Sequence, residues 1–240
     1  QQGYSQAKVA DRIARANHPE RELNVLLRVV SGQKAIYGNI NVEGTDRMDA
    51  AFVARHTGLK AGSEFDPDDL VRARKRIERL GVFSTQKFEE AEELEEGGIQ
   101  PITLVVNERK KRRIGVGATI STIDGVGLEA FWLHRNLFGK AERLKLEAAV
   151  SGLGSTFNYQ KFDYSAAATF TKPGFFNPDT GFSLRFFGKR EVNDTFTEIS
   201  GGTSAHLTHY YNDQLTLKAG VFAQYGRFVD ARGPLEFVTA

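Results

Sequence analysis

The sequence predicts two structural units in series: a small α+β module with the element order β-α-α-β-β, and then the first antiparallel strands of a transmembrane β-barrel. Helix and strand patterns are mixed before residue 108, whereas apolar and polar residues alternate along long segments from about residue 112 to 227. Glycine, asparagine and aspartate turns separate these segments. Because successive side chains of a strand point to opposite faces, such segments suit a barrel wall between lipid and water.

Composition excludes few classes of function. Of the 240 residues, 40% are hydrophobic and 26% charged, the formal net charge is +2, and the mean hydropathy is −0.37. A barrel strand needs only every second residue to be apolar, so this hydropathy is compatible with a membrane protein. The lack of a long apolar run excludes a helical span. There are no cysteines, which excludes disulfides and thiolate metal sites. No signal peptide is present at Gln1, so we expect an exported precursor to carry further sequence.

The α+β module begins with a strand at residues 35–42. A helix is expected to start near Asp46, with Met48, Ala51 and Phe52 on one face. Gly44 separates these two elements, and an apolar helical face indicates packing against a sheet.

The second helix has clearer start and stop signals. Asp66 can cap its first turn, Pro67 suits the first helical position, and Gly81 follows its last residue. Strands at residues 82–90 and 99–107 then complete a three-stranded sheet covered by two helices. The apolar stripe of this helix consists of Leu70, Ala73, Ile77 and Leu80.

A hairpin pattern precedes the module. Strand-like runs at residues 9–16 and 23–30 flank turn residues. The second run resembles the last strand of the module, with Val30 and Val106 lying 76 positions apart, which predicts a tandem repeat. The expected domains are then residues 1–33 as the C-terminal hairpin of a preceding copy, 34–108 as a complete copy, and 109–240 as the N-terminal part of a barrel.

Seven barrel strands are expected in the second unit. The alternation is clearest from Leu215 to Tyr225, where every odd position is apolar and the even positions are mostly small or polar, with Phe222 as the large exception. The expected strands span residues 113–122, 126–136, 140–152, 158–171, 180–191, 195–210 and 214–228.

The module resembles a POTRA domain, the periplasmic module of the Omp85 superfamily. Gly58, Gly62 and Phe65 at the helix connection and the run Ile-Glu-Arg-Leu-Gly-Val-Phe at residues 77–83 carry this resemblance. The second unit looks like the opening barrel strands of an outer-membrane assembly factor, most like the TamA type of the translocation and assembly module. The BamA type, which carries more POTRA copies, is its main sister. The barrel motifs are Ile114 to Gly117, Asp124 to Gly127, Arg135 to Gly139 and Phe170 to Phe176.

This resemblance implies a non-enzymatic factor without cofactors. Its implied place is the outer membrane of a Gram-negative bacterium, with POTRA domains in the periplasm, where it assists the insertion or export of outer-membrane and surface proteins. The implied partners are the outer-membrane bilayer, unfolded outer-membrane or autotransporter clients and an inner-membrane TamB-like protein. Two alternatives remain: a two-partner-secretion transporter of the same architecture, and a soluble β-barrel binding protein with its apolar face turned inward.

Barrels of this superfamily have roughly sixteen strands, so about seven strands make an incomplete barrel. Open sheet edges leave backbone groups that lipid cannot satisfy. The inward-folding, arginine-containing loop of the superfamily would lie beyond residue 240. We therefore expect the isolated chain to close by self-association or strand exchange, and a stable monomer would count against this.

The first barrel strand is the candidate lateral gate. It would meet the last strand of a complete barrel at a seam, where glycines contribute no side chains to packing. Such an edge can template an incoming strand through backbone hydrogen bonds. The alternative is an ordinary lipid-facing wall. The candidate gate residues are Ile114, Gly115, Val116, Gly117, Ala118 and Ile120.

Two further surfaces are candidates. The POTRA strand at residues 82–90 is a candidate docking edge, and a protected edge blunted by charged side chains is the alternative. The basic run at residues 109–113 is a candidate contact for anionic lipid headgroups, and a plain charged linker is the alternative. This run has no interleaved aromatic residues, so nucleic acid is not expected as a partner. The residues concerned are Val82, Phe83, Thr85, Lys87 and Phe88 on the edge, and Arg109, Lys110, Lys111, Arg112 and Arg113 in the basic run.

Catalytic and metal sites are not expected. No nucleophile elbow, P-loop or complete dinucleotide-binding motif is present in the sequence. His206 and His209 are three residues apart in a predicted strand, so they lie on opposite faces and do not share a metal ion.

Overall fold

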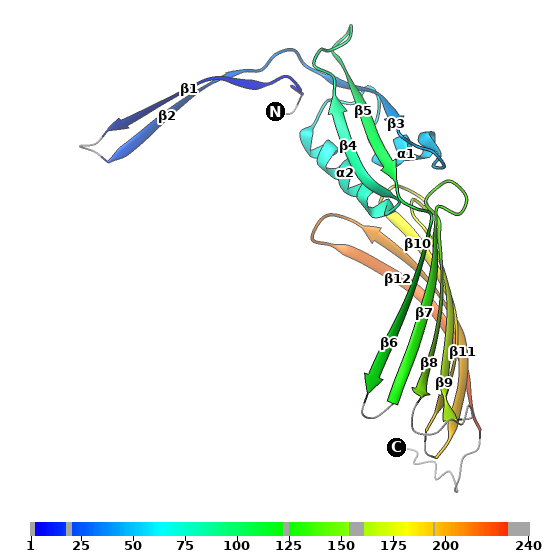
Figure 1. Cartoon of the computed structure of the whole chain (residues 1–240). Coiled ribbons are helices and arrows are strands. Elements are labelled where there is room, and N and C mark those ends of the chain that lie inside the picture. The colour runs from blue at the N-terminus through cyan, green and yellow to red at the C-terminus, as the bar shows by residue number, and fades with distance from the viewer. Residues whose placement is uncertain (1–2, 18–20, 122–124, 154–160, 194, 230–240) are drawn as a thin grey trace. The chain divides into compact units, whose positions relative to one another are not determined.

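Residues 3–17, 21–121, 125–153, 161–193 and 195–229 are described by the structure, a computed structural model (Figure 1). They form three β-sheets and two α-helices. The chain divides into two units, Gln1–Glu108 and Arg109–Ala240. Neither helix in the described ranges is long and apolar enough to cross a membrane.

The first sheet is a hairpin of two antiparallel strands, β1 (Lys8–Asn17) and β2 (Glu22–Val30). Both strands begin and end within one residue of the positions predicted from the sequence. Leu23, Val25, Leu27 and Val29 all lie on one face of β2, and all are exposed. The hairpin therefore presents an apolar face that is uncovered in the described residues.

The POTRA-like module has the predicted element order β-α-α-β-β. Its central strand pairs in parallel with the first strand and antiparallel with the second, so the sheet order is β3-β5-β4. The elements are β3 (Ile36–Glu43), α1 (Ala50–Thr57), α2 (Pro67–Leu80), β4 (Phe83–Glu90) and β5 (Ile99–Glu108).

Helix α2 begins and ends as its sequence predicts. The Asp66 side chain accepts a hydrogen bond of 2.9 Å from the Asp68 nitrogen, and Pro67 occupies the first helical position. Gly81 ends the helix with a φ of 63°, in the left-handed region that glycine adopts without strain.

Helix α1 starts later than predicted. Asp49 caps it by accepting a bond of 3.1 Å from the Phe52 nitrogen, so the helix begins at Ala50 and not near Asp46. The preceding backbone amides, including that of Met48, donate instead to the carboxylate of Glu108. A distant carboxylate thus holds this segment as a loop.

The core of the module lies between the two helices and one face of the sheet. Tyr37 and Phe65 pack with their ring centroids 5.3 Å apart, and the Tyr37 hydroxyl donates to the Asp66 carbonyl at 2.7 Å. The other fully buried side chains of this core include Ile77, Leu80, Ile102 and Leu104. The apolar stripe of α2 therefore packs as predicted.

The second unit is a seven-stranded antiparallel sheet in which each strand pairs with the next along the chain, in the order β12-β11-β10-β9-β8-β7-β6. The sheet is open, with β6 and β12 at its two edges, as the prediction of an incomplete barrel requires. Its strands are β6 (Arg112–Ser121), β7 (Gly125–Arg135), β8 (Arg143–Leu153), β9 (Asp163–Lys172), β10 (Thr180–Val192), β11 (Thr197–Tyr210) and β12 (Thr216–Val229).

Four strands begin later than predicted: β11 at Thr197 and not 195, β12 at Thr216 and not 214, and β8 and β9 by larger margins. Strand β8 starts at Arg143 and not at residue 140, because Asn136 and Ala141 adopt positive φ angles of 60° and 61° in a tight loop. The Leu137 nitrogen donates to the Glu142 carbonyl and closes this loop. Strand β9 starts at residue 163; most of the region between it and the predicted start lies outside the described residues.

Cross-strand register sorts the side chains of this sheet onto two faces. One row on the apolar face consists of Ile114, Trp132, Leu146, Ala168, Phe186, Thr203 and Ala223. The neighbouring row on the other face consists of Gly115, Phe131, Glu147, Ala167, Phe187, Gly202 and Gln224. The predicted alternation is therefore confirmed, and the charged side chains gather mostly on one face.

Candidate functional site

Strand β6 is the first edge of the seven-stranded sheet. It pairs with β7 from Arg112 opposite His134 to Ser121 opposite Gly125, and no other described strand pairs with it. The backbone donors and acceptors on its outer side therefore lack a strand partner within the described part of the chain. A ten-residue edge of this kind is a template for β-strand addition.

All six candidate gate residues lie on β6, but they point to different faces. The side chains of Ile114, Val116 and Ile120 are 72%, 84% and 87% exposed on the apolar face, which Ala118 shares. Gly115 and Gly117 belong to the polar face, opposite Phe131 and Glu129.

Gly115 is packed from the β7 side, away from the expected seam with the last strand of a complete barrel. A methyl group added to Gly115 would overlap the Phe131 ring, which fills this space from β7. At Gly117 the added methyl group would lie 2.6 Å from Oε1 of Glu129, the end of a flexible side chain. Sequence reasoning missed the pairing of Gly115 with Phe131, because it depends on the register between the two strands.

Strand β4 forms an edge of the POTRA sheet, as the docking prediction requires. Val82 and Phe83 are only 3% and 4% exposed, so their side chains belong to the core and would not contact a docked strand. Phe88 is half-buried against the cluster around Tyr37. Thr85 and Lys87 are the exposed members of the predicted set.

The basic run divides between a connection and a strand. Residues 109–111 lie between β5 and β6, and Arg112 and Arg113 are the first residues of β6. Arg135 fixes the connection: its Nη1 donates to the Lys110 carbonyl at 3.1 Å, and its backbone nitrogen donates to the Lys111 carbonyl at 2.6 Å. Arg113 lies over the Phe131 ring on the polar face, at 5.6 Å from its centroid.

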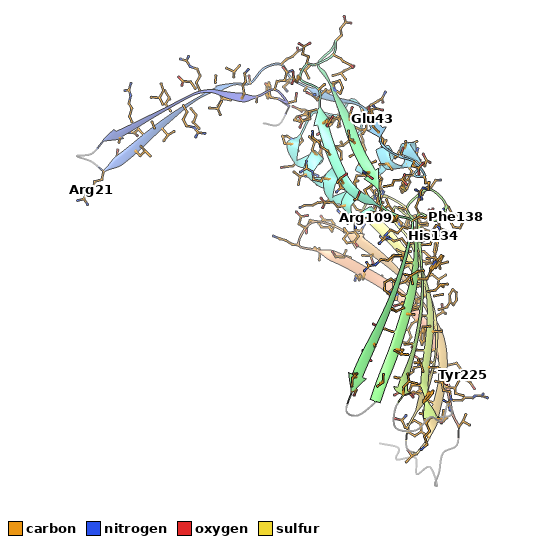
Figure 2. All side chains as sticks on the ribbon, in the orientation of Figure 1. Arg21, Glu43, Arg109, His134, Phe138 and Tyr225 are labelled. Carbon is orange, nitrogen blue, oxygen red and sulfur yellow. The ribbon has the colours of Figure 1, made fainter. Side chains whose placement is uncertain are left out.

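Figure 2 shows Arg109, His134 and Phe138 at the end of the sheet where β6 begins, with Tyr225 toward the opposite end. The two candidate histidines lie apart on β11. His206 is opposite Ser183 on the polar face, and His209 is opposite Thr180, whose Oγ1 is 2.8 Å from His209 Nδ1. Among the described residues, no group of three or more potential ligands is arranged to hold a metal ion.

Two family models match the chain. The model described as the Omp85 superfamily domain matches residues 136–237. The POTRA model, described as a surface antigen variable number repeat, matches residues 35–109. The two matches follow one another along the chain in the order that the fold shows.

Curated relatives include the outer membrane protein assembly factor BamA of Nitratidesulfovibrio vulgaris, which is 26% identical over 200 residues, or 83% of this chain and 24% of the relative. BamA of Neorickettsia risticii is 24% identical over 225 residues, or 90% of this chain and 28% of the relative. The chain therefore spans about a quarter of the length of these relatives.

Solved structures share the fold. BamA from Haemophilus ducreyi lacking POTRA domains 1–3 is 18% identical, with a TM-score of 0.69, and the match covers 95% of this chain and 42% of that chain. CdiB from Escherichia coli is 16% identical, with a TM-score of 0.62 and the same two coverages.

Proposed function

We propose that this chain, which belongs to the Omp85 superfamily and carries a POTRA domain, is part of a factor that assembles outer-membrane proteins by pairing client strands with the free edge of β6. The superfamily resides in the outer membrane with its POTRA domains in the periplasm, and this chain has the same location. The proposed activity is non-covalent, because strand addition makes only backbone hydrogen bonds and side-chain contacts.

The long free edge of β6 is the observation that supports this function best. Ten residues of strand offer backbone groups on one side, and the exposed Ile114, Val116 and Ile120 extend the apolar face to that edge. Lipid cannot hydrogen-bond to these groups, so an incoming strand that pairs with them lowers the free energy of the edge. A client strand with alternating apolar residues would continue the apolar face of the sheet.

Crosslinking in the full-length protein tests this proposal. The chain has no cysteine, so Val116→Cys introduces a single reactive thiol on β6 unless the remaining sequence contributes another. With an added thiol oxidant, we expect disulfide crosslinks from Val116→Cys to a stalled outer-membrane client that carries a single introduced cysteine. The matched control is Leu146→Cys, on the same apolar face but inside the sheet on β8. Equal crosslinking at both positions, or none at either, would contradict the proposal.

We also propose strand addition at β4, the edge strand of the POTRA sheet. The exposed Thr85 and Lys87 flank its free side, although the ion pair of 2.9 Å between Lys87 and Glu89 gives the edge the charges of a protected strand. An extended client peptide added to the POTRA domain should shift the amide resonances of β4 most. Shifts confined to the helices would contradict docking at this edge.

The β1–β2 hairpin supports a proposal about domain organisation: it is the C-terminal hairpin of a preceding POTRA domain. Every second residue of β2 is apolar and exposed, and every second residue of β5 is buried. The residues concerned are Leu23, Val25, Leu27 and Val29 on β2 and Gln100, Ile102, Leu104 and Val106 on β5. An isolated two-stranded hairpin is at best marginally stable in water, so this face requires a cover. In the complete module, the corresponding hairpin is β4–β5. It pairs with β3 along one edge and is covered on one face by the two helices.

A repeat distance of 77 positions fits this proposal better than the predicted 76. The shorter distance would place Arg28 at the site of Leu104, which is fully buried. Matching Val29 with Val106, 77 positions apart, instead aligns Leu27 with Leu104, so apolar residues correspond. The sequence without the burial of Leu104 could not distinguish the two distances, because both faces of β2 contain leucine and valine residues.

The finer assignments follow from the resemblance in sequence. We propose the TamA type, autotransporter clients and a TamB-like partner as one specific version of this function, although the curated relatives are BamA proteins and CdiB shares the fold. A two-partner-secretion transporter shares the architecture and would have one dedicated secreted protein as its client. Membership in an outer-membrane superfamily argues against the soluble binding protein.

A further inference from the structure

Phe131 joins the first two strands of the sheet on the polar face. Its ring occupies the space above Gly115 of β6, its cross-strand neighbour. Arg113 of β6 lies over the same ring at 5.6 Å from the centroid, and Lys145 of β8 lies over it at 5.3 Å. Both contacts are within the range of cation–π attraction. One aromatic side chain on β7 therefore contacts the strand on either side.

The contacts continue from Lys145 toward the middle of the sheet. Lys145 Nζ lies 2.6 Å from Glu147 on the same strand, and the second carboxylate oxygen of Glu147 accepts from Arg185 Nη1 at 3.1 Å. Arg185 also donates to the Thr169 hydroxyl at 3.3 Å. These six residues, Arg113, Phe131, Lys145, Glu147, Thr169 and Arg185, form a polar strap that extends from β6 to β10.

We infer that the polar strap fastens β6 to the sheet, so that this edge strand acts as a fixed template and does not separate from β7 when the seam opens. This inference rests on the proposed function and names the residues that position its site. An edge strand has hydrogen bonds to a neighbour on one side only, so it is the first strand expected to detach. Side-chain contacts across the β6–β7 pair counteract that tendency.

Glycine is required at position 115 because the ring must lie close to the β6 backbone. A ring packed over a glycine of a neighbouring strand shields backbone that has no side chain of its own. The same device occurs between Phe187 and Gly202, where an added methyl group would lie 2.9 Å from the ring. That second pair joins β10 to β11 inside the sheet, whereas Phe131 and Gly115 join the edge strand itself.

Hydrogen exchange on the full-length protein in a lipid bilayer tests the strap with a matched pair of variants. Gly115→Ala displaces the rigid Phe131 ring, whereas Gly117→Ala meets the flexible side chain of Glu129, at its carboxylate and at Cγ. Alanine replaces glycine in both, so both variants change backbone flexibility alike. We expect the β6 amides bonded to β7 to exchange about tenfold faster in Gly115→Ala and to be unchanged in Gly117→Ala.

Two further variants guard against a general loss of folding. Phe131→Leu should also speed hydrogen exchange in β6. Phe131→Tyr keeps the aromatic ring and should leave the slow rate unchanged. Exchange that is equally fast in both glycine variants, or that rises as much in β10 and β11 as in β6, would overturn the inference.

The outcomes separate the strap from the proposed function. If Gly115→Ala loosens β6 but Val116→Cys captures no client, the strap stands and the client-pairing function fails. If Val116→Cys captures a client but Gly115→Ala leaves exchange in β6 unchanged, the function stands and the strap fails.

Discussion

Oε1 of Glu108 lies 2.8 Å from the backbone nitrogen of Met48. The same oxygen accepts hydrogen bonds of 2.9 Å from the nitrogens of Asp46 and Arg47. Three consecutive amides thus converge on one carboxylate at the last residue of β5. This arrangement binds the end of the POTRA sheet to the loop that precedes α1.

We predict that Glu108→Ala destabilises the POTRA domain by about 2 kcal/mol. A hydrogen bond to a charged group contributes on the order of 1.5–3 kcal/mol, and the Glu108 carboxylate is partly exposed, which reduces the sum over its three bonds. Glu108→Gln keeps an acceptor oxygen and should cost less than half as much. Urea unfolding of residues 34–109, followed by helical circular dichroism, measures both. Equal losses in the two variants would show that the charge, and not the acceptor oxygen, matters most.

Tyr37 makes the POTRA domain sensitive to alkali. Burial raises the pKa of its hydroxyl to about 12, and the nearby carboxylates of Asp69 and Asp66 act in the same direction. The folded pKa exceeds the unfolded value of about 10. The stabilising contribution is therefore complete below about pH 10 and is lost as the pH rises through about 12.

Phenolate absorbance of the isolated POTRA domain, residues 34–109, measures this ionisation directly. Tyr37 is the only tyrosine in that part of the sequence. We predict late ionisation that coincides with loss of helical signal, and a Tyr37→Phe variant that lacks this alkaline transition. Ionisation near pH 10 without unfolding would contradict the prediction.

The two helices illustrate what the sequence determines locally. Helix α2 carries its own signals, since Asp66, Pro67 and Gly81 are adjacent to its ends, and these signals predicted its bounds. The start of α1 depends on Glu108, some sixty residues away, so no local pattern could locate it. Period-two alternation likewise predicted the barrel strands, because each strand places its own apolar residues on one face.

The candidate site shows the same limit. The position of β6 at the edge followed from its place as the first strand of the barrel. The sequence could not predict that Phe131 covers Gly115, because this contact requires the register of two strands. It also could not separate the buried Val82 and Phe83 from the exposed Thr85, because the bulge between Phe83 and Thr85 interrupts the alternation of β4.

The basic connection should bind anionic membranes. We predict that the double variant Lys110→Gln/Lys111→Gln weakens binding of residues 34–113 to anionic vesicles by about thirtyfold at low salt, since each cation near such a surface contributes on the order of 1 kcal/mol. Vesicle co-sedimentation measures this, and added salt should reduce the difference. The control, Lys60→Gln, changes a lysine elsewhere in the POTRA domain. An equal loss on zwitterionic vesicles would point to misfolding and against headgroup contact.

The β1–β2 hairpin should be covered on one face in the full-length protein. Val25 and Leu27 lie on its apolar face, opposite Ala14 and Arg12, whereas Asn24 and Arg28 lie on the other face, opposite Arg15 and Asp11. If the helical half of a preceding POTRA domain packs on the apolar face, cysteines introduced there lose access to solvent, and those on the other face do not.

We predict that Val25→Cys and Leu27→Cys react with maleimide at least about tenfold more slowly than Asn24→Cys and Arg28→Cys in the folded full-length protein, because thiol modification at a covered site requires local opening. In denaturant all four should react at similar rates. The four positions belong to one strand, so differences in strand stability affect them alike. Rapid modification at all four positions would mean that the apolar face remains uncovered and that the hairpin is not part of a preceding domain.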